Sequence, residues 1–520
     1  MNMNESVHPI SDANSAPERT PSARETAFAW VAVAIGYLFC RLFPISASPF
    51  GALLIIAAFY IAGGIFLRLT GAVQNRRSVF CLVTSIVFSL SLIVASDGLV
   101  HSLSVLWALG CFMMWVMLSY GGGLEKRAGG LLFYDVIKAM FAMPFASFAE
   151  FFRSLVPHRG KEGGGRIARQ AGFALLGLLA AVIPTAIVIL LLSYDEAFSK
   201  NIVLFVSGEM PERAVALLFA IPVAAYGYGA FISGIDKKHE TRMRACDCRS
   251  FARTARFAPE TMSCFAMLPL ILVYAVFFAS QWTYYVSAFS GRLPDGVDIY
   301  SQYARDGFGE LCTVSGINAA VMIVVFAFTK RRDPDRHSPA TRIFVGLLSV
   351  STIILVATAI SKMVLYIRVY GLTHRRVYAS WFMLLLAAGF LIVLIKQIFP
   401  RVNAVCALLA VFVLFFGVLA LSDTNGRIAQ YNVDRYINGT LAMPGIGELQ
   451  TLSNECGDSA IPEIARLSLA VRDRPECSDT QKAADTVLAD WLDADTPDLL
   501  EMTLPRLRAR RAAKNAMDKS

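Results

Sequence analysis

The sequence predicts an all-α membrane protein, a polytopic bundle of about eleven transmembrane helices followed by a small helical extramembrane module. Of its 520 residues, 56% are hydrophobic and only 17% are charged, whereas soluble domains carry about 25% charged residues. Apolar runs able to cross a hydrocarbon core of ~30 Å recur along the chain. Short basic stretches separate these runs, whereas an outer-membrane barrel would show short alternating segments.

The chain opens with a polar segment, residues 1–26, which we expect to be a disordered cytoplasmic tail. The first apolar run is similar to a signal-peptide core, but Pro49 after the candidate cleavage site and the nearly neutral tail favour an uncleaved span. The predicted bundle covers residues 27–421. Its expected spans are 27–43, 50–69, 80–95, 99–119, 170–193, 214–235, 262–289, 311–329, 343–360, 377–399 and 404–421.

One apolar segment, residues 131–156, is interrupted by polar groups. It contains Asp135, Lys138 and Glu150, and Pro144 lies in the middle of the run. Charges and a proline at these positions suit an interfacial or re-entrant helix better than a full span. We therefore expect this segment to lie at the membrane surface.

The loops predict the orientation of the bundle. Basic connections at 76–77, 126–169, 237–256 and 330–342 alternate with connections poor in Lys and Arg at 96–101 and 194–212. The basic set should be cytoplasmic, which places the N-terminus inside and the C-terminal tail outside, unless one span is miscounted. The formal net charge of +9 lies in these loops. The expected partner is therefore the lipid bilayer and not nucleic acid.

After residue 421 the composition becomes that of a soluble domain. Apolar residues recur at helical spacing within 449–452, 461–471 and 484–492, which predicts a small helical extracytoplasmic module over residues 422–502. The last residues, 503–520, are basic, and we expect them to be disordered.

Two of the ten cysteines, Cys456 and Cys477, lie in this module. An extracytoplasmic position would expose them to an oxidising compartment, so a disulfide is expected between them. The closed loop of about twenty residues would stabilise the module by roughly 3 kcal/mol. The alternative is a pair of free, separately packed thiols, in a module on either side of the membrane.

Charged residues gather at the predicted outer ends of the eighth to tenth spans, where positive charge should be rare. Arginines kept there could receive a phosphate or carboxylate. They could also form structural ion pairs or bind headgroups, which we weight about two to one over a ligand site. The candidate polar site comprises Arg305, Asp306, Glu310, Arg368, His374, Arg375 and Arg376.

Two further polar residues, Lys362 and Gln281, lie within predicted spans and are secondary candidates. Lys362 can extend its ammonium to the interface, which we favour over a proton or anion site in the bundle.

Motifs of known chemistry are missing from the sequence. There is no phosphate-binding G-x-x-x-x-G-K-[ST], no G-x-S-x-G and no H-E-x-x-H pattern. Cys246 and Cys248 form a C-x-C pair with only His239 nearby, too few ligands for structural zinc. We therefore predict no metal and no cofactor, and we favour a protein that is not an enzyme.

Four stretches carry a resemblance to a known family: YARDGF at 303–308, YGLTHRR at 370–376, NGRIAQYNVDRY at 425–436, and LS with DSAIP at 452–462. In these stretches the chain resembles a bacterial family of multi-pass membrane proteins, the domains of unknown function numbered four-one-five-three and four-one-seven-three. Gly309 departs from the pattern, where an aromatic residue is usual. The resemblance implies a protein of the bacterial cytoplasmic membrane and brings no activity with it.

These features favour an envelope accessory or sensor protein, in which the outer site and the C-terminal module read a signal or hold an envelope protein partner. A transporter is the first alternative, although few charges lie deep in the spans. The second is a membrane transferase acting on a lipid-linked phosphate, with an anionic headgroup on the arginines and Asp306 or Glu310 as base.

Overall fold

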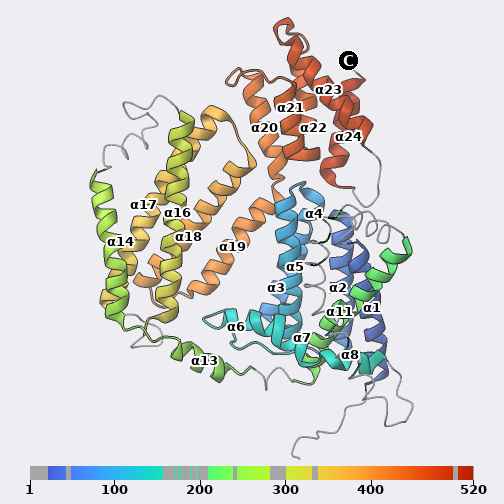
Figure 1. The fold of residues 1–520 in the computed structure, drawn as a ribbon, viewed down its shortest axis with the longest axis vertical. Helices are drawn as coiled ribbons and strands as arrows, with labels where there is room; N and C mark the ends of the chain where they lie inside the picture. Colours follow the sequence, from blue (N-terminus) through green and yellow to red (C-terminus); the bar gives the residue numbers. More distant parts are fainter. Residues whose placement is uncertain are drawn as a thin grey trace, which may run out of the picture. The chain divides into compact units, whose positions relative to one another are not determined.

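The structure is a computed structural model built of α-helices (Figure 1). It describes residues 21–42, 49–155, 209–237, 243–280, 300–330, 338–495 and 502–518, with isolated positions between 156 and 208. Within these residues, 11 helices are long and apolar enough to cross a membrane. The predicted all-α polytopic fold class is confirmed. Most of the expected span at 170–193 and most of the N-terminal tail lie outside the described residues.

The segment for which the sequence predicts an interfacial helix is one of these candidates, Leu132–Leu155. Its helix is not continuous. It comprises α6 (Leu132–Ile137), a π-helix η1 (Lys138–Ala142), α7 (Met143–Ala146) and α8 (Phe148–Leu155). Length and composition would allow it to cross, but the π-helix and the break at Ser147 interrupt it, so the interfacial position stays a prediction.

The chain forms two compact units, residues 1–41 with 143–236, and residues 42–142 with 237–520. In the first unit, α1 (Ala23–Leu42) packs closely on α11 (Glu209–Ile235). A Cβ added at Gly36 would lie 2.6 Å from the carbonyl oxygen of Ala220, so only glycine permits this approach. Small residues at helix contacts are typical of membrane bundles.

The second unit contains most of the long helices. Tyr60 joins two of its first helices, because its hydroxyl donates to Ser85 Oγ at 2.6 Å. Phe88 meets Phe416 edge-to-face, with ring centroids 4.8 Å apart. The helices are α2 (Pro49–Leu69), α3 (Arg76–Ser89), α4 (Ser91–Val94), α5 (Gly98–Ser119), α13 (Ala245–Thr254), α14 (Glu260–Ser280), α16 (Tyr300–Phe328), α17 (Pro339–Tyr370), α18 (His374–Ile398) and α19 (Ala404–Leu421).

A polar network connects α14, α16 and α17 inside their candidate spans. The Tyr274 hydroxyl donates to Asn318 Oδ1 at 2.7 Å, and the Asn318 amide donates to Thr352 Oγ1 at 2.9 Å. Such interhelical hydrogen bonds stabilise membrane bundles by about 0.6–2 kcal/mol each. The three helices are therefore held by polar contacts as well as by packing.

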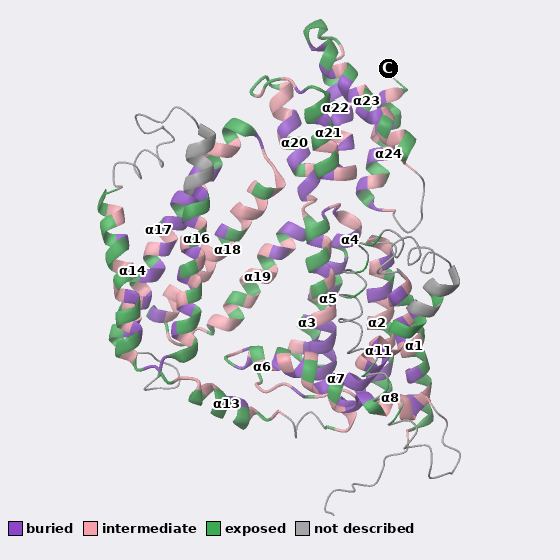
Figure 2. Ribbon diagram, in the orientation of Figure 1, coloured by how far each residue is buried: buried purple, intermediate pink, exposed green. Residues whose placement is uncertain are grey.

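The outward faces of the candidate spans carry large apolar side chains, seen as exposed positions in Figure 2. Phe265 is 71% exposed, Val276 70% and Leu414 64%. In the span windows of α14 and α19 only 17% of the residues are buried inside the structure. Lipid acyl chains suit such faces, whereas water would penalise them.

The C-terminal helices pack around their own apolar core. Leu449, Ile464, Leu467 and Leu488 are all 0% exposed there. The structure has short helices over the three stretches where helical spacing predicts them. This C-terminal module consists of α20 (Thr424–Ile437), α21 (Ile446–Cys456), η2 (Gly457–Ser459), α22 (Ile461–Val471), η3 (Pro475–Cys477), α23 (Ser478–Ala494) and α24 (Leu504–Met517).

The end of the chain corrects one prediction. Residues 503–520, expected to be disordered, contain α24. Its alanines, including Ala509 and Ala513, are buried against the module core. Arg506 and Arg510 pair with Asp495 at 2.9 and 2.8 Å. The basic residues that suggest a solvated tail therefore flank an apolar stripe of small side chains.

The expected disulfide is also corrected. Cys456 and Cys477 are free thiols in the structure, and both are buried in the core of the module. Cys456 ends α21 and Cys477 ends η3. Each packs as a small hydrophobic side chain. Packing, and not a covalent link between these two cysteines, holds the module core together here.

Candidate functional site

The turn between α17 and α18 is held against α20 by one asparagine. Gly371 ends α17 with a positive φ of 78°. Asn432 Oδ1 accepts the Leu372 amide, and its Nδ2 donates to the Leu372 carbonyl, both at 2.8 Å. A Cβ at Gly371 would lie 2.6 Å from Asn432 Oδ1. Residue 371 must therefore be glycine for two reasons: its φ is positive, and Asn432 leaves no room for a Cβ.

Two arginines satisfy carbonyl groups at the C-terminal end of α17. The guanidinium of Arg376 lies 4.1 Å from the centre of the Tyr366 ring and donates to the carbonyls of Tyr370 and Gly371. Arg435 donates to the carbonyl of Ile367 at 3.2 Å. Cations at a helix C-terminus offset the negative end of the helix dipole.

A chain of side-chain hydrogen bonds then joins α18 to the C-terminal module. We call Ser96, His374, Asp423, Asn425 and Ser459 the junction network. The pairs His374 Nε2–Asn425 Oδ1, Asn425 Nδ2–Ser96 Oγ, Ser96 Oγ–Ser459 Oγ and Ser459 Oγ–Asp423 Oδ1 are 2.6, 3.1, 2.8 and 2.8 Å apart. The network connects residues up to 363 positions apart in sequence.

The direction of these bonds follows from their donors. Asn425 Nδ2 also donates to the Cys456 carbonyl at 3.2 Å, which identifies Oδ1 as the acceptor facing His374. His374 therefore carries a proton on Nε2. The Ser459 hydroxyl donates a hydrogen bond to the Asp423 carboxylate. In the Ser96–Ser459 pair, Ser96 is therefore the donor. Along the path from His374 to Asp423, each bond has its donor on the side of the imidazole and its acceptor on the side of the carboxylate.

Asp97 lies beside the network at the start of α5. Its Oδ1 accepts the amides of Leu99 and Val100 at 3.0 and 3.2 Å, and its Oδ2 accepts the Tyr378 hydroxyl from α18. The residue is only 4% exposed. His101 donates from Nε2 to the Ala95 carbonyl at 2.8 Å. A buried carboxylate thus joins the bundle helices at the same end as the module.

The predicted site residues are only partly brought together. His374 belongs to the junction network, and Arg376 bonds to carbonyls of the adjacent α17–α18 turn, while Arg368 and Arg375 are exposed. Glu310 is exposed on α16, and Lys362 is buried within α17 at 6% exposure. The side chains of Arg305 and Asp306, and all of Gln281, lie outside the described residues. In the part of the chain that is described, no group of three His, Cys, Asp or Glu residues could hold a metal ion.

Most of the junction network lies outside the candidate polar site that the sequence predicts. The residues outside it are Ser96, Asp423, Asn425 and Ser459 of the network, and the neighbouring Asp97. A signal did exist for two of them, because Asn425 and Ser459 lie in the motif stretches that carry the family resemblance. For Asp97 the signal was its position before an apolar run, where aspartate caps a helix.

The fold and the site define an integral membrane protein with many candidate spans, whose C-terminal helical module is hydrogen-bonded to one end of its bundle. A family model described as "Domain of unknown function (DUF4153)" matches residues 82–467. The chain belongs to this family, which confirms the resemblance seen in the motifs. The matched residues include the whole junction network. No curated protein and no solved structure matches the chain.

Proposed function

We propose that this integral membrane protein is an envelope accessory or sensor protein of the bacterial cytoplasmic membrane. In this function the C-terminal module holds a partner or reads a signal, and the junction network passes its position to α5 and α18. The single observation that carries the proposal is the unbroken hydrogen-bonded path from Asp423 and Ser459 in the module to Ser96 and His374 at the helix ends. A sensor needs such a physical link between an outer domain and its spans.

The same contacts support an extracytoplasmic module. Ser459 of the module bonds to Ser96, so both lie on the same side of the membrane. Ser96 belongs to a connection poor in Lys and Arg, whereas Arg76 and Arg77, in the preceding basic connection, lie at the opposite end of α3. The positive-inside rule then favours a module outside the membrane. This argument for the module does not depend on the number of spans, whereas an N-terminus inside also requires that both α1 and α2 cross.

In-cell photocrosslinking tests the proposal. A photoreactive phenylalanine replaces Ile446 or Leu469, which are 46% and 37% exposed on the module. The matched control is the same probe at Leu414, which is 64% exposed on α19. We expect a discrete protein adduct from the module positions and lipid adducts from the control. Identical adduct patterns at all three positions would refute a partner-holding module.

Reporter fusions provide a second, independent test. Fusions after Ser119 and Lys330 should read cytoplasmic, and fusions after Asp97 and Leu421 should read extracytoplasmic. A cytoplasmic signal after Leu421 would place the module inside and exclude an extracytoplasmic sensor.

A transporter is the second candidate, and the network of Tyr274, Asn318 and Thr352 is the observation that favours it, because it places polar groups within three neighbouring spans. The side-chain amide of Asn318 uses both its oxygen and its nitrogen within this network, as structural contacts between membrane helices do. We therefore rank transport below the sensor function. Loss of solute uptake in an Asn318→Leu variant that folds normally would reverse this order.

A further inference from the structure

A groove runs between α3 and α19, along the halves of these helices that lead to the C-terminal module. Its volume is about 640 Å³. The described residues that line it fall within 83–88 of α3 and 413–421 of α19, and Ser422 and Arg427 complete one end. We call it the α3–α19 groove. Both helices are candidate spans, so the groove lies on the membrane-embedded part of the chain.

The wall of the α3–α19 groove is apolar. Apart from Thr84, the described lining residues within the two helices are aliphatic, aromatic or glycine. The Thr84 hydroxyl donates to the Phe80 carbonyl at 2.9 Å and accepts the Trp107 indole at 3.2 Å, so both of its roles are used within the protein. In a bilayer, hydrocarbon fills an apolar hollow of this kind better than water does.

Gly417 gives the groove part of its width. Beneath it, Phe88 is 1% exposed and meets Phe416 edge-to-face. A Cβ added at Gly417 would lie 3.5 Å from the Phe88 ring, which is an ordinary contact. Close packing therefore does not demand glycine here, and the missing side chain leaves space at the surface of the helix.

The length of the groove matches one leaflet of a membrane. Its lining on α19 extends from Val413 to Leu421, which at ~1.5 Å per residue is about 12 Å along the helix. Half of a hydrocarbon core of ~30 Å is about 15 Å. A single acyl chain from the leaflet on the module's side can therefore follow the groove over most of its depth.

A cation stands at the end of the groove where that leaflet has its headgroups. Arg427 is exposed, and its Nε donates to the Ser422 carbonyl at 2.9 Å, which holds the guanidinium beside the end of α19. A guanidinium carries five N–H donors in a planar fork that fits phosphate oxygens. Asp423, the nearest carboxylate in the sequence, accepts the Ser459 hydroxyl and the Gly426 amide.

We propose that the α3–α19 groove binds one anionic phospholipid, with an acyl chain between the two helices and its phosphate on Arg427. The apolar wall and the cation follow each other in the order in which a leaflet presents acyl chain and headgroup. A zwitterionic choline headgroup would bring its own ammonium toward the arginine, which opposes binding. No residue of the junction network lines the groove, so this inference does not rest on the proposed sensor function.

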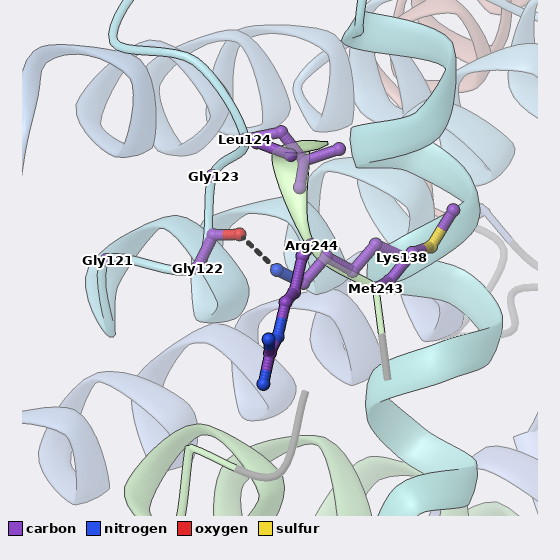
Figure 3. A pocket seen from close by; sticks show the side chains of 8 residues that line it. Gly121, Gly122, Gly123, Leu124, Lys138, Met243 and Arg244 are labelled. Carbon is purple, nitrogen blue, oxygen red and sulfur yellow. Dashed lines mark hydrogen bonds between the residues drawn. The ribbon is translucent and has the colours of Figure 1, made fainter. Parts of the chain in front are cut away.

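Another cavity, at the end of α5 that leads into residues 121–124, has a different wall (Figure 3). Three glycines, Lys138 and Arg244 make up most of its described lining. Lys138 Nζ donates to the Gly122 carbonyl at 2.9 Å, so this side chain ties η1 to the loop after α5. Such a wall offers little apolar surface to an acyl chain, and the α3–α19 groove is the better lipid site.

Site-specific photocrosslinking of the full-length protein tests the proposal. The protein is placed in nanodiscs of equal phosphatidylglycerol and phosphatidylcholine. A compact aliphatic diazirine residue replaces Leu414 in the groove, and the matched control is the same probe at Leu272 of α14, which is 56% exposed. Mass spectrometry gives the ratio of the two lipid adducts. The headgroup variant is Arg427→Gln, and its control is Arg474→Gln, an exposed arginine of the module that also bonds to a backbone carbonyl.

We expect the probe at Leu414 to favour phosphatidylglycerol at least fivefold and the probe at Leu272 to show no such preference. Arg427→Gln should lower the ratio at Leu414 to the ratio at Leu272, whereas Arg474→Gln should leave it unchanged. The proposal is overturned if the two probe positions give equal ratios, or if Arg427→Gln has no effect. Adducts at Leu414 to the protein's own chain instead of lipid would also overturn it.

A second variant tests the acyl-chain part of the site without touching the arginine. Val418→Trp places a large side chain in the groove at a position that is 63% exposed, and Leu408→Trp is the control on the same helix outside the groove, at 40% exposure. Val418→Trp should lower the yield of phosphatidylglycerol adduct at Leu414 at least threefold. A yield equal to that of Leu408→Trp would show that no acyl chain occupies the groove.

Discussion

The carboxylate of Asp97 serves two helices at once, because it caps α5 through the amides of Leu99 and Val100 and accepts the hydroxyl of Tyr378 from α18. These helices begin 276 residues apart in the sequence, since α5 starts at Gly98 and α18 at His374. A single side chain therefore fixes how two distant segments meet beneath the C-terminal module. The acceptor is a carboxylate that is 4% exposed, and a hydrogen bond to a carboxylate is stronger than one between neutral groups.

Substitutions at this pair should separate its two roles. Tyr378→Phe removes only the bond between helices and should destabilise the protein by about 1.5–3 kcal/mol. Asp97→Ala also removes the cap, which adds about 1 kcal/mol. Asp97→Asn keeps a capping side chain and should fall between the two. The measurement is the unfolding midpoint in detergent; equal midpoints for Tyr378→Phe and the wild type would contradict the bond.

Glycine substitutions should reveal the contact between the α17–α18 turn and α20. Gly371→Ala introduces both a strained positive φ and a collision with Asn432 Oδ1, at 2.6 Å from the new Cβ. Gly439→Ala is the matched control, because Gly439 has a φ of 68° and nothing within 4 Å of an added Cβ. We expect the free energy of unfolding to fall by about 1 kcal/mol in the control and by at least about 1 kcal/mol more in Gly371→Ala. Similar melting temperatures for the two variants would show that Asn432 moves aside freely.

The ion pair between Arg77 and Asp135 should be important for stability. The side chain of Asp135 is 1% exposed and that of its partner Arg77 15% exposed. Arg77→Ala leaves a buried carboxylate without its cation and should cost about 3–5 kcal/mol. Arg466→Ala is the control, since Arg466 and its partner Asp434 are 42% and 44% exposed and such pairs contribute about 0–1 kcal/mol. A smaller loss for Arg77→Ala than for Arg466→Ala would contradict the ion pair in the structure.

The Cys456 thiol should make stability depend on alkaline pH. Burial, with the nearby charges of Glu455, Asp423 and Asp97, raises the pKa of this thiol to about 12. An unfolded cysteine has a pKa of about 8.5, so the folded protein keeps its proton where the unfolded chain loses it. The contribution of this thiol to the free energy of unfolding is complete below pH ~8.5. It is lost as the pH rises toward the pKa of the thiol in the folded protein, by about 1.4 kcal/mol per pH unit.

Melting curves of the wild type and Cys456→Ala at pH 8, 9 and 10 check this expectation. The wild type should lose roughly 2 kcal/mol more than Cys456→Ala between pH 8 and 10. Parallel losses in both proteins would mean that the thiol titrates normally in the folded state.

The sequence predicts the long helices well, but it does not predict which residues of different helices are in contact. Long apolar runs predict spans because backbone groups in a bilayer must be satisfied within the segment. His374 and Arg376 were found because charge at that end of the bundle is unusual. Ser96 and Asn425 were missed because uncharged polar residues 329 positions apart give no periodic signal.

Two other failures have local causes. The basic end of the chain suggested disorder because charge dominates its composition, while the helix depends on a stripe of alanines such as Ala509 and Ala513. The disulfide was expected because an extracytoplasmic module is exposed to an oxidising compartment and because the loop between the two cysteines has a suitable length. Neither argument indicates whether two buried thiols face each other.

Helix α5 begins at the Asp97 cap and ends at Ser119, so its 22 residues form a rod of about 33 Å. A helix resists axial compression, so a displacement at the C-terminal end of α5 would be transmitted along the rod to the Asp97 cap and, through Tyr378, to α18.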